Sequence, residues 1–123
     1  MTYCQDKRIM RILRGTKSLA VYITLEGLDW DLLAPPPGYT YEAEIEVRGE
    51  NNATLSATIA NSNTVKFTLN AYEESDIFYN VGMYNMRVKA LKKTSQGEIA
   101  AQLVFEVDTC IYIYDEILCP PLC

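Results

Sequence analysis

Hydrophobic and polar residues alternate with a period of two along most of this chain. In residues 41–48 the odd positions hold Tyr, Ala, Ile and Val, and the even positions hold three Glu and one Arg. Because neighbouring side chains of a strand point to opposite faces, this alternation predicts a strand with one buried and one charged face. The same period recurs in shorter runs, at residues 8–13, 19–25, 55–59, 65–69, 84–90, 99–107 and 112–114. The pattern therefore predicts seven or eight strands.

Turn-forming residues, mainly Gly, Asn, Ser and Thr, separate these runs at residues 14–16, 49–52, 61–63 and 94–97. Gly and Asn tolerate positive φ, which suits tight turns. Residues 70–76 are suited to one helical turn between two strands. Residues 26–40 include three consecutive prolines, each of which fixes φ and removes a backbone donor, so an extended loop is expected there. Short strands at these spacings predict an all-β sandwich.

The strand rhythm stops after residue 107. A chain of 123 residues fits a single core. The residues after position 107 hold three of the four cysteines and the pair Pro120-Pro121. We therefore expect a β-sandwich domain at residues 1–107 and a C-terminal arm at residues 108–123.

The four cysteines are candidates for disulfide bonds: Cys4, Cys110, Cys119 and Cys123. A bond between Cys119 and Cys123 is disfavoured, because an extended Pro-Pro segment holds the α-carbons about 12 Å apart, beyond the ~7 Å that a disulfide spans. The cysteines also lack the two-residue spacing of zinc-binding pairs, so no metal site is expected. Free thiols, as in other proteins of a reducing cytosol, are the alternative.

The overall composition removes several kinds of chemistry. The chain has no histidine, which excludes Ser-His-Asp and Cys-His catalysis, imidazole metal ligands and a histidine pH switch. Acidic residues outnumber basic ones by 16 to 11, so the net charge is −5 and nucleic acid is not an expected partner. The apolar stretch at residues 19–25 is too short to span a bilayer and does not resemble a secretory leader. We expect no cofactor, no membrane partner, and synthesis in the cytoplasm.

An acidic group surrounds the only tryptophan. Glu26, Asp29 and Asp31 flank Trp30 in the predicted loop. One interpretation is a Ca²⁺ site, or a sugar site with Trp30 as a stacking platform. Ca²⁺ takes six to eight oxygen ligands, however, and these residues supply too few. The favoured interpretation is a loop that packs Trp30 and Leu32 under the edge of the sandwich.

A second acidic group lies on a predicted strand. Glu42, Glu44 and Glu46 are about 7 Å apart along one face, a separation that is also found between the catalytic carboxylates of glycosidases. Catalytic pairs occupy a cleft and differ in pKa, whereas three like charges in a row on an open face are typical of a solvated surface. No lysine lies where burial would activate it as a nucleophile. The chain is therefore expected not to be an enzyme.

Tyrosine is the most abundant aromatic residue, with nine Tyr against three Phe and one Trp. It combines a large apolar area with a polar tip at a low entropic cost, which is typical of protein interfaces. Some of the tyrosines are expected in the core. The interface candidates, taken from outward-facing and loop positions, are Trp30, Tyr39, Tyr112, Tyr114 and Tyr22.

Several short motifs occur in an order that is similar to a known family. Arg14-Gly15-Thr16 precedes an alternating strand, and Gly-Leu-Asp-Trp-Asp-Leu at residues 27–32 follows it. Gly-Met-Tyr-Asn-Met-Arg-Val at residues 82–88 opens a strand with a Gly-x-Tyr start, and residues 99–107 close the unit. Across residues 7–107 this order resembles the immunoglobulin-like β-sandwich domains of tailed-phage virion proteins, such as the N-terminal domain of baseplate upper proteins. The resemblance implies an immunoglobulin-like antiparallel β-sandwich of seven to eight strands, here with a C-terminal arm.

The resemblance also implies a function. Domains of this kind have no catalytic site and anchor or decorate a larger assembly. We expect a non-enzymatic structural and interaction module of a phage particle, as a tail, baseplate or capsid-decorating component of the virion. Its expected partners are other virion proteins and copies of itself, as a homo-oligomer. The alternative is a carbohydrate-binding module or host-surface adhesin domain, with Trp30 and Tyr39 as its stacking platform.

Overall fold

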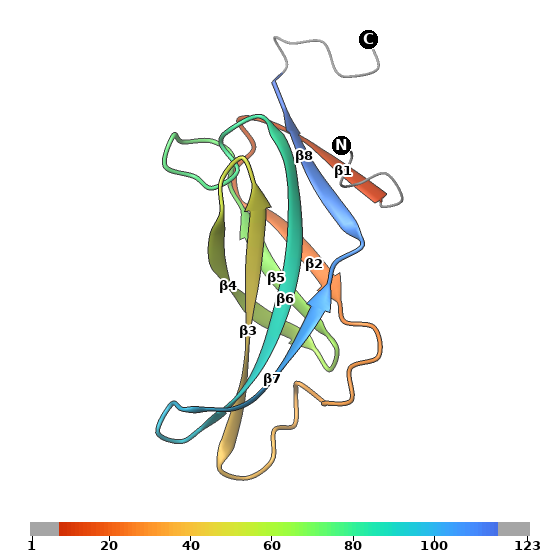
Figure 1. The fold of residues 1–123 in the computed structure, drawn as a ribbon, viewed down its shortest axis with the longest axis vertical. Helices are drawn as coiled ribbons and strands as arrows, with labels where there is room; N and C mark the ends of the chain where they lie inside the picture. The colour runs from red at the N-terminus through yellow and green to blue at the C-terminus, as the bar shows by residue number, and fades with distance from the viewer. Residues whose placement is uncertain (1–7, 116–123) are drawn as a thin grey trace.

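The computed structural model describes residues 8–115, and within this range the chain forms eight β-strands and no helix (Figure 1). The strands are β1 (Arg8–Leu13), β2 (Leu19–Thr24), β3 (Tyr39–Gly49), β4 (Ala53–Asn61), β5 (Thr64–Leu69), β6 (Gly82–Thr94), β7 (Ile99–Glu106) and β8 (Thr109–Tyr114). The prediction of an all-β fold is thus confirmed, and every expected strand is present.

The helical turn expected at residues 70–76 is absent. The Asp76 carboxylate accepts the backbone N–H groups of Tyr72 and Glu73, at 3.0 and 2.7 Å. An Asp side chain that binds nearby backbone donors in this way stabilises a turn in competition with helical hydrogen bonds. The segment is therefore a series of turns between β5 and β6.

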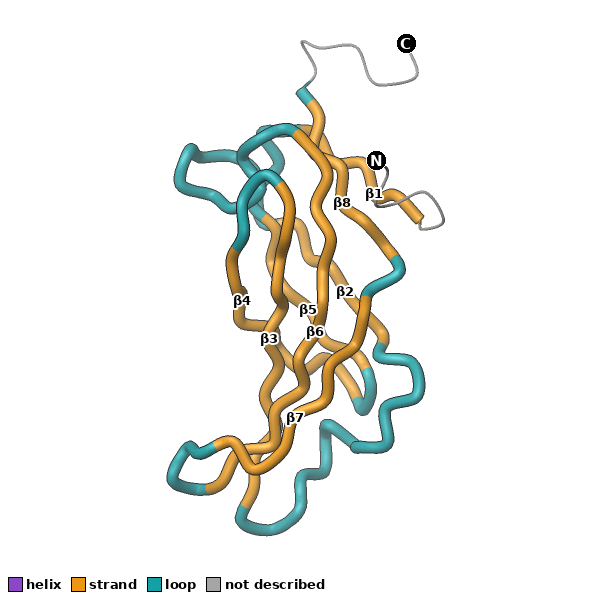
Figure 2. The backbone as a smooth tube through the Cα atoms, viewed as in Figure 1, coloured by secondary structure: helices purple, strands orange, loops and turns teal. Residues whose placement is uncertain are grey.

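The strands form one curled mixed sheet in the order β1-β8-β6-β3-β4-β5-β2, with β7 also paired to β6. The sheet curls into a half-barrel, so that β2 and β5 lie behind β3 and β6 (Figures 1 and 2). β4 makes the turn between the two parts. Its residues 53–57 pair with β3, its later residues pair with β5, and the register shifts between Ile59 and Asn61. One pair differs from the antiparallel expectation, because β1 runs parallel to β8.

The core fills the inside of this curl. On β3 the residues Ala43, Ile45 and Val47 are buried and the glutamates between them face outward, as the alternation predicts. Val88, which pairs with Ile45 from β6, is fully buried on the same face, and Val65 on β5 is fully buried in the other part of the sheet. Both parts of the sheet therefore contribute one face to a single hydrophobic core.

Residues 109–114 of the expected arm belong to the sheet, which corrects the expected boundary. β8 lies between β1 and β6, and its residues Cys110, Ile111 and Ile113 are fully buried. The rhythm breaks at residues 107–108 because β6 is long enough to pair with two strands in turn. Its residues 87–93 pair with β7, and its residues 82–84 pair with β8. The rest of the expected arm, residues 116–123, lies outside the described residues.

Tyr84 anchors the start of β6. Its hydroxyl donates a hydrogen bond to the backbone carbonyl of Asn80 at 2.7 Å, and its ring meets the Phe78 ring edge-on at 5.0 Å. Burial and the nearby charge of Glu50 raise the pKa of the Tyr84 hydroxyl, so it stays protonated and able to donate. Gly49 on β3 allows the close approach, since a Cβ there would lie 2.3 Å from the Met83 carbonyl oxygen.

Candidate interaction site

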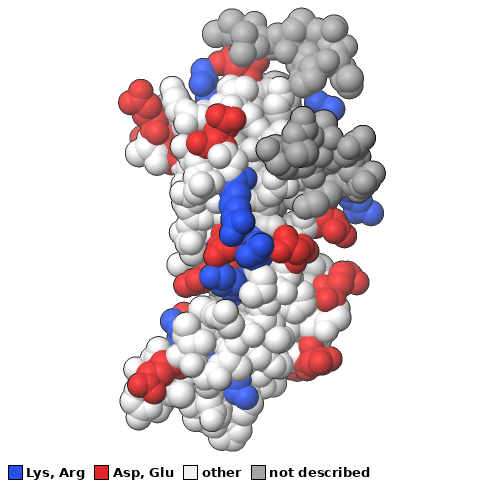
Figure 3. Space-filling model, viewed as in Figure 1, with Lys and Arg blue, Asp and Glu red and all other residues white. Residues whose placement is uncertain are grey.

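Two of the three glutamates in the β3 row, Glu42 and Glu46, take part in a set of ion pairs that we call the charge ladder: Glu42, Glu46, Arg48, Arg87, Lys89, Lys93 and Glu106. Lys89 Nζ lies 2.8 Å from Glu46 Oε2, and Lys93 Nζ lies 2.9 Å from Glu42 Oε1. Figure 3 shows acidic and basic side chains interleaved in a band across this face. The predicted solvated surface is thus a face on which β3 carboxylates meet β6 cations.

The electrostatics of Glu46 are opposite to those of a general acid. The hydrogen bond from Lys89 lowers the pKa of the Glu46 carboxyl, and the charges of Lys89, Arg87 and Arg48 lower it further against the opposing effect of burial. A catalytic carboxylic acid needs a raised pKa. Glu46 is therefore held ionised as part of the charge ladder.

The acidic loop does not assemble a metal site in the part of the chain that the structure describes. Within residues 8–115, no group of three or more His, Cys, Asp or Glu side chains is arranged to hold a metal ion. Asp31 instead accepts the backbone N–H of Leu33 at 3.0 Å, which stabilises the loop locally. Leu32 is buried, so this loop packs against the sheet as the favoured interpretation predicts.

Trp30 and Tyr39 each have a partner within the chain. The Trp30 ring stacks on the Tyr41 ring, with centroids 5.0 Å apart and planes at 11°. The Lys92 ammonium lies over the Tyr39 ring, 4.7 Å from its centroid. One face of Trp30 is thus covered by Tyr41, which leaves less ring surface for a sugar than a free platform offers.

The other three interface candidates lie on β2 and β8. Tyr22 is 60% exposed on β2, with the Lys66 ammonium 6.0 Å from its ring centroid. Tyr112 and Tyr114 stack on each other, 6.3 Å between centroids, and are half-buried on β8. Among the ring contacts of residues 8–115, none joins these tyrosines to Trp30 or Tyr39. Apart from the stacked pair Tyr112 and Tyr114, no ring contact of the described residues brings the five candidates together.

Exposed apolar side chains mark strands that have a free edge. Five of the eight large exposed hydrophobic residues lie on β1, β2 and β7, each of which pairs on one side only within the described residues. They are Ile9, Leu19, Tyr22, Ile99 and Val104. Sequence analysis identified only Tyr22 among them, because period-two alternation does not reveal which strands end up at an edge.

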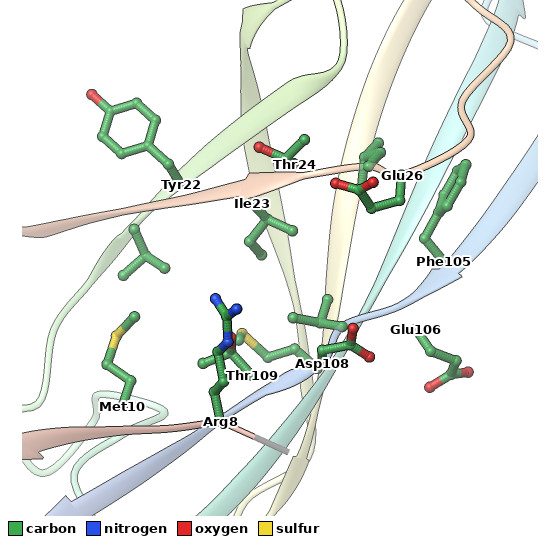
Figure 4. Close-up of a pocket in the computed structure, with 14 residues that line it drawn as sticks. Arg8, Met10, Tyr22, Ile23, Thr24, Glu26, Phe105, Glu106, Asp108 and Thr109 are labelled. Carbon is green, nitrogen blue, oxygen red and sulfur yellow. The ribbon is translucent and has the colours of Figure 1, made fainter. Parts of the chain in front are cut away.

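A groove of about 560 Å³ opens along the seam of the half-barrel (Figure 4). β2 forms one wall, and β1 together with the ends of β7 and β8 forms the other. Its apolar lining includes the side chains of Met10, Val21, Ile23, Met86, Phe105 and Val107. Four charged residues stand around it: Arg8, Glu26, Glu106 and Asp108. Sequence reasoning missed this groove because its walls come from segments that only the strand order brings together.

Cys110 is disulfide-bonded and fully buried, with its Sγ 3.1 Å from Asn85 Oδ1. The other three cysteines, Cys4, Cys119 and Cys123, lie outside the described residues.

Comparison with known proteins finds no family model and no curated protein that matches this chain. Over residues 8–115, no helix has the length and apolar character needed to cross a membrane.

Proposed function

We propose that this chain is a non-enzymatic structural module of a phage particle, which assembles through contacts with copies of itself and with other virion proteins. It is a tail, baseplate or capsid-decorating component, made in the host cytoplasm and incorporated in the virion. The observation that carries the assembly role is the set of exposed apolar side chains on the three free-edged strands β1, β2 and β7. Exposed apolar edges are templates for pairing with another chain, which most monomeric proteins avoid.

The proposal includes an immunoglobulin-like arrangement of the strands. In that arrangement β2, β5 and the second half of β4 correspond to one sheet, and β3, β6, β7 and β8 correspond to the other. The hydrogen bond from the Tyr84 hydroxyl to the Asn80 carbonyl supports it, because many such sandwiches have a tyrosine that bonds to the backbone a few residues upstream at the start of an equivalent strand.

The charge ladder supports a binding role rather than catalysis. Its carboxylates are neutralised by Lys and Arg from the neighbouring strand, and the pKa of Glu46 is lowered. Such a face keeps the outside of the sheet solvated and leaves association to the edges. A module that associates through its strand edges and not through its sheet face can pack in a defined orientation.

The first test is the native mass of the purified chain at increasing concentration, with and without reductant. We expect an oligomer whose mass falls to that of a monomer in the triple variant Tyr22→Thr, Ile99→Thr, Val104→Thr. A matched control replaces Leu33, which is exposed in a loop, with Thr and keeps the oligomer. A parent that stays monomeric at every concentration contradicts the self-association.

The second test concerns the particle itself. Mass spectrometry of purified particles of the phage whose genome encodes this chain is expected to detect its peptides in a constant ratio to the major structural proteins. Their absence from purified particles, with the chain present in the infected cell, contradicts the virion role.

A further inference from the structure

The free edge of β2 presents unused backbone groups. β2 pairs with β5, and the Leu25 N–H donates to the Asn63 carbonyl at 2.8 Å in the continuation of the same register. Because bonded pairs alternate along an antiparallel ladder, the N–H and C=O groups of Ala20, Tyr22 and Thr24 face away from β5. No strand of the described residues pairs with them. Among the strands of residues 8–115, this edge is therefore left for one further strand.

The groove lies directly beside this edge. Val21, Ile23 and Met86 are buried on its walls, with exposed fractions of 4%, 8% and 3%, and Met10 and Phe105 are half-buried next to them. In Figure 4 Ile23 points into the groove, whereas Tyr22 and Thr24 point away from it. A strand added to β2 would direct every second side chain into this apolar space.

The charges at the groove favour a basic occupant. Glu106 is paired with Arg87 at 2.9 Å. Glu26 and Asp108 are both exposed, and within residues 8–115 neither carboxylate has an ion-pair partner. Arg8 contributes the single positive charge among the groove residues. With Glu106 paired, the groove retains two carboxylates against the one cation of Arg8. A Lys or Arg of the occupant would complement this excess of negative charge.

We infer that the groove binds an extended segment of a partner protein, which adds a strand to β2, places alternate apolar side chains in the groove and sets a basic residue beside Glu26 and Asp108. This inference rests on the proposed assembly role and names the site and the partner chemistry for it. The edge of β7 also lies open, but its exposed residues Ile99 and Val104 do not line the groove. Strand addition with side-chain specificity is therefore assigned to β2.

The test uses the full chain and a fluorescent seven-residue peptide that alternates valine and threonine between two terminal lysines. Its symmetric pattern lets it dock in either strand direction. A second peptide with the same centre carries glutamate at both ends. Fluorescence anisotropy is expected to show that the lysine peptide binds and that the glutamate peptide binds at least about tenfold more weakly.

Variants locate the binding. Tyr22→Pro removes an edge N–H that has no bond within the sheet, and we expect it to weaken peptide binding by about tenfold or more. Gln102→Pro is the matched control. Val107 N–H donates to the Met86 carbonyl at 3.3 Å, so by alternation the N–H of Gln102 faces away from β6 on the other free edge. Gln102→Pro is expected to bind the peptide as the parent does.

A second double variant tests the charges. Glu26→Gln with Asp108→Asn is expected to weaken binding of the lysine peptide by about threefold to tenfold and to bring the two peptides to similar affinities. The control Glu73→Gln with Glu98→Gln removes the same charge far from the groove and is expected to leave the preference unchanged.

Hydrogen exchange of the parent provides a measurement that needs no variant. Saturating lysine peptide is expected to slow exchange at the amides of Ala20, Tyr22 and Thr24 and not at Val104. No binding up to ~1 mM peptide overturns the inference, as does equal binding by Tyr22→Pro and its control. If Tyr22→Pro abolishes an oligomer of the chain while no peptide binds, the occupant is a second copy. That result overturns the inference that a segment of a partner protein binds in the groove, and it leaves the proposed assembly role intact.

Discussion

Glu46 shows how one residue on an open sheet face becomes electrostatically fixed. It pairs with Arg87 in the register between β3 and β6. Its carboxylate accepts a hydrogen bond from the ammonium group of Lys89, two residues further along β6. Because these cations favour the ionised form, the pKa of Glu46 is lower in the folded protein than in the unfolded chain. The ion pairs of Glu46 therefore stabilise the fold only while its carboxyl group is ionised.

Acid is expected to weaken the fold through Glu46. A lowered pKa in the folded state gives stability that is present above the unfolded pKa, about 4.3 for a glutamate. This stability is lost as the pH falls from there through the lowered pKa of Glu46. We expect Glu46→Gln to lose less stability than the parent between pH 6 and pH 3, measured as urea midpoints. Glu98→Gln is the control, and an identical pH dependence of the two variants contradicts the ladder.

Tyr84 is expected to stabilise the fold through its hydroxyl as well as its ring. Tyr84→Phe keeps the buried ring but leaves the Asn80 carbonyl without its donor, and we expect a loss of about 1–2 kcal/mol in the free energy of unfolding. Tyr22→Phe is the control at an exposed position and should change it by less than about 0.5 kcal/mol. Chemical denaturation measures both, and equal stabilities would argue against the anchor.

β8 is the element on which sequence and structure differ most. The expected strand at residues 112–114 exists, but it begins at Thr109 and is inserted between β1 and β6. A pattern shows which residues alternate. It does not show that β6, with strand residues from Gly82 to Thr94, has room for two partners on one side. β3 was predictable almost to its ends because residues 41–48 alternate without interruption, and all eleven residues of the strand pair with β6.

The position of β8 predicts a large effect from a single truncated side chain. Ile113 is fully buried, so Ile113→Ala is expected to reduce the free energy of unfolding by about 2–4 kcal/mol through lost burial and the cavity left behind. Ile99→Ala, on the exposed part of β7, should change it by less than about 0.5 kcal/mol. A small effect at Ile113, measured by urea denaturation, would mean that β8 is not part of the core.

At the scale of the whole molecule, the groove is the feature that the sequence did not reveal. Its walls are far apart along the chain, at residues 8–10, 21–26 and 105–109, with Met86 between them. Their meeting depends on the parallel pairing of β1 with β8 and on the curl of the sheet, which are both set by long-range register. Local alternation specifies the face of each strand but carries no information about which edges remain unpaired.

A single core predicts a single unfolding transition. Residues of β7 and β8 pack on the same hydrophobic core as those of β2 and β5, so these strands share one interior. We expect Trp30 fluorescence and far-ultraviolet circular dichroism to give coincident urea unfolding curves, as in two-state domains. A transition that one probe reports and the other does not would contradict this prediction, because it would mean that part of the sheet unfolds independently of the rest.

The parallel pairing of β1 with β8 also has a mechanical consequence. The two strands are matched at six positions, from Arg8 opposite Thr109 to Leu13 opposite Tyr114. Tension applied through the chain before β1 and after β8 pulls these strands lengthwise in opposite directions. Their backbone bonds then carry the load together, whereas an antiparallel pair pulled from adjacent ends would open one bond at a time. A module built this way resists stretching along its own chain.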